Sequence, residues 1–289
     1  MVKKNDMSFD LYTSLLKMFD EFHEKSASVN LSYELSNPNL YEIRTKYGLD
    51  DIIGKGETFS QVSNLLFWLS KNLYHNGNFD NFKEDLNAIK LLEYSYKKGK
   101  EYGINCRALS IILTECLLSL GFMARTIYLL PFSPYDFDNH VVTHVYIKEL
   151  KKWVMLDPTF GCYVMNKERI PLNIFEIREL LANQDFIIFN KEIKYNDEKK
   201  DENSQALKEY YAKNLFYFTT REKSCFDAEK ENRIIHILPL NYDVKRKEIL
   251  NIEYRIKKEG DAEWIQNWLK DMKENKYLYI SPLEIIKNQ

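Results

Sequence analysis

Cys106 is the residue whose position most clearly suggests chemistry. It follows Gly103-Ile104-Asn105 and begins an apolar segment, 106–120, which is expected to be a helix capped by Gly121. At a helix N-terminus the free N–H groups and the helix dipole stabilise an anion and so lower the pKa of a thiol. We therefore predict that Cys106 is a nucleophile. Cys116 lies inside the same helix and is expected to be a small core residue.

A cysteine nucleophile needs a histidine to carry its proton and a third group to orient that histidine. The sequence offers both on a predicted hairpin, in which strands 140–147 and 153–157 are joined by a charged turn. His140 and His144 lie on the first strand, and Asp157 ends the second. Positions two apart on a strand share a face, so the hairpin can bring an imidazole beside Asp157. Strand parity alone does not choose between the two histidines.

Four segments follow one another along the chain: a glycine shortly before a cysteine at a helix start, a Leu-Gly-x-x-Ala-Arg turn, a strand opened by His-Val, and a Trp-x-x-x-Asp-Pro-Thr strand. In this order they resemble the core of the transglutaminase-like superfamily, which includes bacterial cysteine proteases and peptide N-glycanases. The resemblance spans roughly residues 58–160. The matching pieces are Gly103–Cys106, Leu120–Arg125, His140–Tyr146 and Trp153–Thr159.

The resemblance implies a Cys106–His140–Asp157 triad. Cys106 corresponds to the nucleophile and Asp157 to the orienting carboxylate. His140 opens its strand, as the base does in the superfamily pattern, whereas His144 occupies a position that is often Glu. The fold implied is α+β and papain-like: the helix that carries the nucleophile packs on an antiparallel sheet that carries His and Asp.

Stabilising a growing oxyanion requires a donor, and the backbone N–H of Cys106 is the natural one. Superfamily members often add a side chain from an upstream helix. Gln61 and Trp68 are candidates for that role, and the sequence does not choose between them.

The flanks of this core carry no recognisable chemistry. We expect an N-terminal helical segment over 1–57, the transglutaminase-like core over 58–190 and a small C-terminal α/β extension over 191–289. The boundary is placed at the very polar stretch 191–205. Outside the hairpin, we expect helices at 8–24, 84–97, 172–182, 206–218 and 262–274. A further helix is expected to start at Thr58, where Thr58 and Gln61 make a capping box. Strands are expected at 123–131, 234–240, 249–256 and 276–281.

Composition excludes several classes of partner. The 41 Lys+Arg balance 43 Asp+Glu, so the net charge gives no electrostatic case for a nucleic-acid partner or for an anionic membrane surface. No run of about 18 apolar residues predicts a membrane span, and no secretion signal is recognisable, so we expect a cytoplasmic protein with its four cysteines reduced. The cysteines form no CxxC pair, which argues against zinc, and we expect no cofactor.

The activity predicted is thiol-dependent acyl transfer on an amide bond of a protein or peptide, through a Cys106 thioester. The acyl acceptor is either water, as in a peptidase or amidase, or an amine, as in a transglutaminase. We favour hydrolysis because no calcium site is recognisable. The alternative is a catalytically silent fold of this type that binds a protein or peptide.

Overall fold

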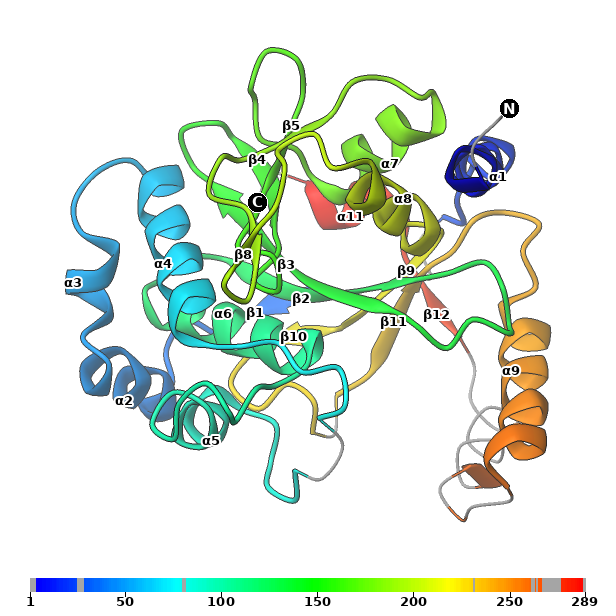
Figure 1. Ribbon diagram of the computed structural model, residues 1–289. Coiled ribbons are helices and arrows are strands. Elements are labelled where there is room, and N and C mark those ends of the chain that lie inside the picture. The colour runs from blue at the N-terminus through cyan, green and yellow to red at the C-terminus, as the bar shows by residue number, and fades with distance from the viewer. Residues whose placement is uncertain are drawn as a thin grey trace.

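A computed structural model describes residues 4–24, 29–79, 82–230, 232–260, 263, 265–266 and 277–287. At its centre is a sheet of six strands with helices on both faces (Figure 1). The described helices are α1 (Lys4–Met18), α2 (Pro38–Lys46), α3 (Leu49–Ile53), α4 (Thr58–Asn72), α5 (Ala88–Tyr94), α6 (Cys106–Ser119), α7 (Ile174–Ala182), α8 (Gln205–Asn214), α9 (Val244–Glu259) and α11 (Pro282–Ile286). The described strands are β1 (Ser32–Tyr33), β2 (Ala124–Leu130), β3 (His140–Ile147), β4 (Lys152–Leu156), β5 (Val164–Met165), β6 (Ile188–Phe189), β7 (Lys194–Tyr195), β8 (Glu198–Lys199), β9 (Tyr217–Arg221), β10 (Lys223–Ser224), β11 (Ile234–Ile237) and β12 (Leu278–Tyr279).

The strands of the central sheet lie in the order β12-β11-β9-β2-β3-β4. Neighbours run antiparallel except for β11 and β12, which are parallel. The structure is therefore a mixed α+β fold, as predicted. Among the described residues, no helix is long and apolar enough to cross a membrane.

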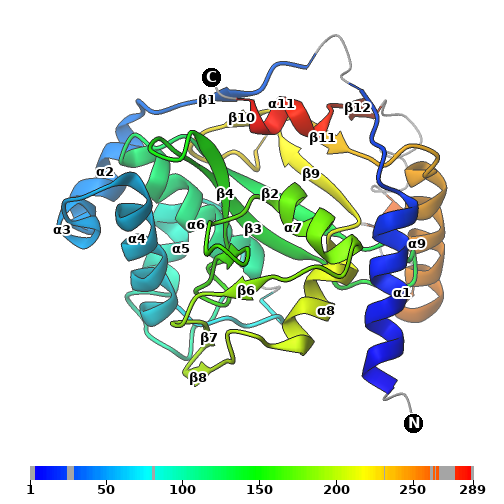
Figure 2. The same cartoon turned by 90° about the horizontal axis from the view of Figure 1, so that it is seen from above.

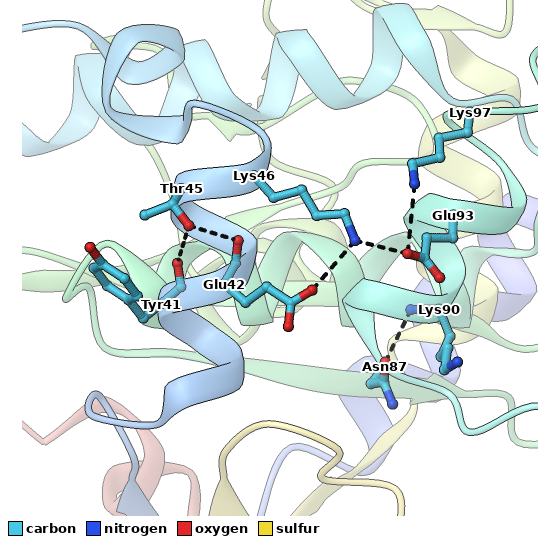
Figure 3. A network of polar contacts seen from close by, with 8 residues as sticks. All are labelled: Tyr41, Glu42, Thr45, Lys46, Asn87, Lys90, Glu93 and Lys97. Carbon is cyan, nitrogen blue, oxygen red and sulfur yellow. Dashed lines mark hydrogen bonds and ion pairs between the residues drawn. The ribbon is translucent and has the colours of Figure 1, made fainter.

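Two apolar cores fill the spaces between the sheet and its helices. Helices α2 to α6 pack on one face, and α1, α7 and α8 pack on the other (Figure 2). Because both faces are covered, every residue of β3 except Tyr146 is buried. On the α6 side, the helices are also linked at the surface: Lys46 of α2 bridges Glu42 and Glu93, and Glu93 lies on α5 (Figure 3).

The register of β3 and β4 brings the end of one strand close to the start of the other. Thr143 lies opposite Leu156, so the next residue, Asp157, lies beside the first residues of β3. The chain bends there, and Asp157 forms a bridge with Cys162. Side chains alternate between faces along a strand. Leu156 belongs to the core on the α6 side, so Asp157 points to the opposite face, which also carries His140.

The sheet crosses the boundary that was expected near residue 190. Strands β9, β11 and β12 come from 191–289 and continue the sheet beyond β2. From the other end of the chain, β1 pairs with β10, and α1 packs on α7 and α8. Segment 191–289 thus shares the central sheet with 58–190, and residues of 1–57 pack into both apolar cores.

Two local predictions are wrong. Residues 249–256, expected as a strand, lie inside α9, whose start is capped by the Asp243 side chain and which ends at Gly260 with φ 88°. The capping box at Thr58 does not form, because the Glu149 carboxylate accepts bonds from both the backbone N–H and the hydroxyl of Thr58.

Other predicted elements hold with shifted ends. The helix expected over 206–218 stops at Asn214, and its last residues begin β9. The helix expected over 262–274 falls largely outside the described residues.

Candidate active site

Helix α6 begins at Cys106, as predicted, and the residue before it explains why. The Asn105 side chain accepts a hydrogen bond of 3.0 Å from the backbone N–H of Ala108, which is the arrangement of a helix N-cap. One turn into the helix, the Ser110 hydroxyl donates to the carbonyl oxygen of Val141 at 2.7 Å. This bond fixes α6 along β3 and leaves the half-buried Cys106 beside the start of that strand.

His140 and Asp157 form a buried pair. The Nε2 atom of His140 lies 2.5 Å from Oδ2 of Asp157, and the two residues are 1% and 0% exposed. The same Oδ2 atom accepts a 2.5 Å bond from the Tyr211 hydroxyl. The other oxygen, Oδ1, accepts a 2.9 Å bond from the backbone N–H of Thr159. The carboxylate is thus held by three donors, which offset the cost of burying its charge.

The Cys106 thiol interacts with two imidazoles, those of His140 and His75. Burial by itself would raise the pKa of the thiol, but the two imidazoles outweigh burial and lower that pKa to about 6. Burial likewise opposes the charged form of His140. The negative charges of Asp157 and of the thiolate prevail and raise the pKa of His140 above its usual value. Near neutral pH, Cys106 and His140 therefore favour the thiolate–imidazolium state.

His75 was not recognised from the sequence as a residue of this site. It follows α4 in a segment that pairs with Ile104, just before α6. Its Nδ1 atom lies 2.9 Å from the Tyr195 hydroxyl, and the Asn196 side chain bonds both its backbone N–H and its carbonyl oxygen. With Nδ1 engaged by Tyr195, Nε2 is the ring nitrogen that remains for Cys106.

The two upstream residues considered from the sequence make other contacts. The Gln61 side chain donates to the carbonyl oxygen of Gly54 at 2.9 Å. The Trp68 ring packs against Tyr96, with 5.1 Å between ring centroids. Of the side chains preceding α6, His75 is therefore the one with a described contact to Cys106.

His144 is buried in a different environment from His140. Its ring stacks on Trp153 at 5.8 Å between centroids, and neither ring nitrogen has a hydrogen-bond partner within the described residues. Burial, followed by the charges of Arg125 and Lys152, lowers the pKa of His144 to about 3. A neutral imidazole packed in this way fills space in the core and does not exchange protons with Cys106.

Aromatic rings surround the Cys106–His140 pair. Tyr210 and Phe160 lie 5.2 and 5.9 Å from the His140 ring, measured between centroids. Tyr195 packs on Phe160 at 5.7 Å. All three rings are half-buried, so each keeps part of its surface exposed on the His140 side of the site.

The remaining cysteines lack the setting of Cys106. Cys116 and Cys162 are fully buried, and burial raises the pKa of each thiol. Cys225 is half-buried, and burial also raises its pKa. All four cysteines are free thiols, and within the described part of the chain no group of His, Cys, Asp and Glu side chains could hold a metal ion.

Comparisons with known proteins add little to this picture. No protein-family model matches the chain, and no curated protein matches it. Among solved structures, one from Cytophaga hutchinsonii described as "a Putative Cysteine Protease" is 20% identical. The match covers 41% of this chain and 37% of that chain, with a TM-score of 0.32. Similarity at this level carries no argument, so membership of the transglutaminase-like superfamily stays a prediction of the sequence motifs.

Proposed function

We propose that this protein is a cysteine-dependent acyl-transfer enzyme that cleaves an amide bond in a protein or peptide. One observation carries the proposal: a thiol at a helix N-terminus interacts with a histidine whose Nε2 atom lies 2.5 Å from a buried carboxylate. This is the arrangement that nucleophilic cysteine catalysis requires. The papain-like core is part of the same proposal, with α6 as the helix of the nucleophile and β3 and β4 as the strands of His140 and Asp157.

In the acylation step, the Cys106 thiolate attacks the substrate carbonyl carbon and forms a C–S bond. The C–N bond then breaks, and the His140 imidazolium gives its proton to the leaving amine. Asp157 keeps the ring oriented and stabilises its charge. In the second step, His140 takes a proton from water as the water attacks the thioester. The C–S bond then breaks, which releases the acid and restores the thiolate–imidazolium pair. An amine acceptor would replace water in a transglutaminase.

The tetrahedral intermediates place negative charge on the former carbonyl oxygen. We assign its stabilisation to the backbone N–H of Cys106 and to Nε2–H of His75. If the Tyr195 hydroxyl donates to Nδ1 of His75, the neutral ring carries its proton on Nε2 and can donate there. The half-buried aromatic rings beside Cys106 suit an apolar part of the substrate. A cytoplasmic location remains a prediction of the sequence.

Labelling of the purified protein with an iodoacetamide probe near the thiol pKa of about 6 tests this proposal. The matched control is Cys225, the other half-buried thiol, whose pKa is raised. Cys106→Ala should abolish low-pH labelling, and Cys225→Ala should leave it unchanged. Resistance of wild-type Cys106 to the probe would favour the silent binding module.

The substrate can then be sought in a lysate treated with wild-type protein or with the Cys106→Ala variant. New protein N-termini that depend on Cys106 would indicate hydrolysis, and new covalent cross-links would indicate an amine acceptor. If neither product forms although Cys106 reacts with the probe, the proposed activity on proteins is contradicted.

A further inference from the structure

The Asp157 carboxylate has a hydrogen-bond partner that the triad does not account for. Its Oδ2 atom is shared between Nε2 of His140 and the hydroxyl of Tyr211, both at 2.5 Å. Tyr211 lies on α8, in the segment 191–289 that the sequence left without chemistry. The hydroxyl also lies 3.6 Å from the Cys162 sulfur, a much weaker partner. Its main bond is therefore the one to Asp157.

Burial makes this bond consequential. Asp157 and Tyr211 are both 0% exposed, so protein donors must supply what solvent would otherwise give the carboxylate. The Tyr211 ring is fixed by stacking on Phe189, with 5.9 Å between centroids. Burial and the Asp157 charge raise the pKa of the Tyr211 phenol well above its usual value, so the hydroxyl stays a donor.

Helix α8 is also tied to the loop that leads into His140. Lys213 pairs with Asp138 at 2.6 Å and with Asp136 at 3.1 Å. One helix therefore contacts both members of the histidine–carboxylate pair: it donates to Asp157 directly and anchors the segment just before His140.

We propose that Tyr211 is a positioning residue that shares Oδ2 of Asp157 with His140 and thereby sets the strength of the bond between Asp157 and His140. This inference rests on the proposed function of the site. A carboxylate that accepts fewer hydrogen bonds is a stronger base. By occupying part of Oδ2, Tyr211 weakens the pull of Asp157 on the His140 proton, so the imidazolium can release its other proton to a leaving amine.

The direct readout is the NMR signal of the proton between His140 Nε2 and Asp157, which resonates far downfield in bonds of this kind. Tyr211→Phe removes one donor from Oδ2, so the remaining bond should strengthen and its signal should move further downfield. The matched control is Tyr217→Phe. Tyr217 is also buried, and its hydroxyl donates a 2.8 Å hydrogen bond to the carboxylate of Glu248, outside the site. The Tyr217→Phe variant should lower the melting temperature by a similar amount without moving the signal.

A second measurement avoids any variant that fails to fold. Biosynthetic replacement of tyrosine by 3-fluorotyrosine makes the phenols more acidic and strengthens the Tyr211 bond, so the signal should move upfield. An unchanged signal in both experiments would overturn the role of Tyr211. Failure of the proposed function would look different: Cys106 of the wild type would then resist low-pH alkylation, whatever the position of the downfield signal.

Discussion

His140 and His144 lie four residues apart on β3 and have opposite surroundings. His140 has its Nε2 atom 2.5 Å from the Asp157 carboxylate, which raises the pKa of its imidazole. His144 stacks on Trp153, and burial lowers its pKa to about 3. Both side chains lie on the same face of the strand. The difference arises because Asp157 sits beside the start of β3, where the chain leaves β4.

Replacement of Asp157 by Ala should lower acyl transfer by orders of magnitude while slow alkylation of Cys106 persists. The carboxylate orients His140 and stabilises its positive charge, but the thiol remains in place without it. The change also leaves the buried Tyr211 hydroxyl and Thr159 N–H without their hydrogen-bond acceptor, which should lower the free energy of unfolding by about 3 kcal/mol.

Urea unfolding and alkylation kinetics measure both effects of this change. The control is Asp50→Ala, which removes an exposed ion pair with Arg44 and should cost about 1 kcal/mol or less. Alkylation of Asp157→Ala at the wild-type rate would indicate that Asp157 only shapes the turn after β4.

Replacement of His75 by Ala should slow acylation by an activated aryl ester by about a hundredfold or more. The ester passes through a tetrahedral intermediate that needs an oxyanion donor, whereas alkylation by iodoacetamide does not. The two rates are compared well above the thiol pKa, where Cys106 is ionised in either protein. Alkylation should then change little.

Two further variants sharpen the test of His75. His75→Gln retains a side-chain donor and should recover part of the acylation rate. His23→Ala removes a histidine that stacks on Tyr279, away from the site, and should have no effect. Equal loss of acylation and alkylation in His75→Ala would reduce His75 to a structural role.

The neutral, buried His144 should make folding stability fall in acid. Its pKa drops from 6.5 to about 3 on folding, so between these values only the unfolded chain binds the proton. This contribution to stability is complete above pH 6.5 and shrinks as the pH falls, by about 2 kcal/mol at pH 5. His144→Phe keeps a ring against Trp153 and removes this proton uptake. Urea unfolding at pH 7 and pH 5 should therefore show a smaller acid loss in the variant, and an equal loss would contradict this assignment.

The elements that carry the candidate triad could be predicted because their signals are local. Cys106 opens α6 and His140 opens β3, as the sequence patterns indicated. His75 and Tyr211 could not be found in the same way. His75 is held by Tyr195, 120 residues away, and Tyr211 reaches Asp157 across 54 residues. No spacing along the chain marks such contacts.

The wrong predictions also have physical causes. Alternating apolar residues at 249–256 suggested a strand, but the Asp243 side chain caps a helix that begins at Val244 and runs through this segment. At Thr58, a carboxylate from the turn after β3 takes the place of the expected capping box. In both cases, a side chain outside the segment used for the prediction, Asp243 or Glu149, determined the local structure.

The most direct test of the account is the rate of Cys106 alkylation as a function of pH in His140→Ala and His144→Ala. Wild-type protein should react with iodoacetamide down to the thiol pKa of about 6, well below the usual value for cysteine. Loss of His140 removes the positive partner of the thiolate, so reactivity near pH 6 should collapse. Loss of His144 should leave it intact. Because His75 and the helix N-terminus still favour the thiolate, the two variants are compared with each other and not with zero. If His144→Ala loses the low-pH reactivity and His140→Ala keeps it, or if neither differs from the wild type, the central claim that His140 is the base for Cys106 is wrong.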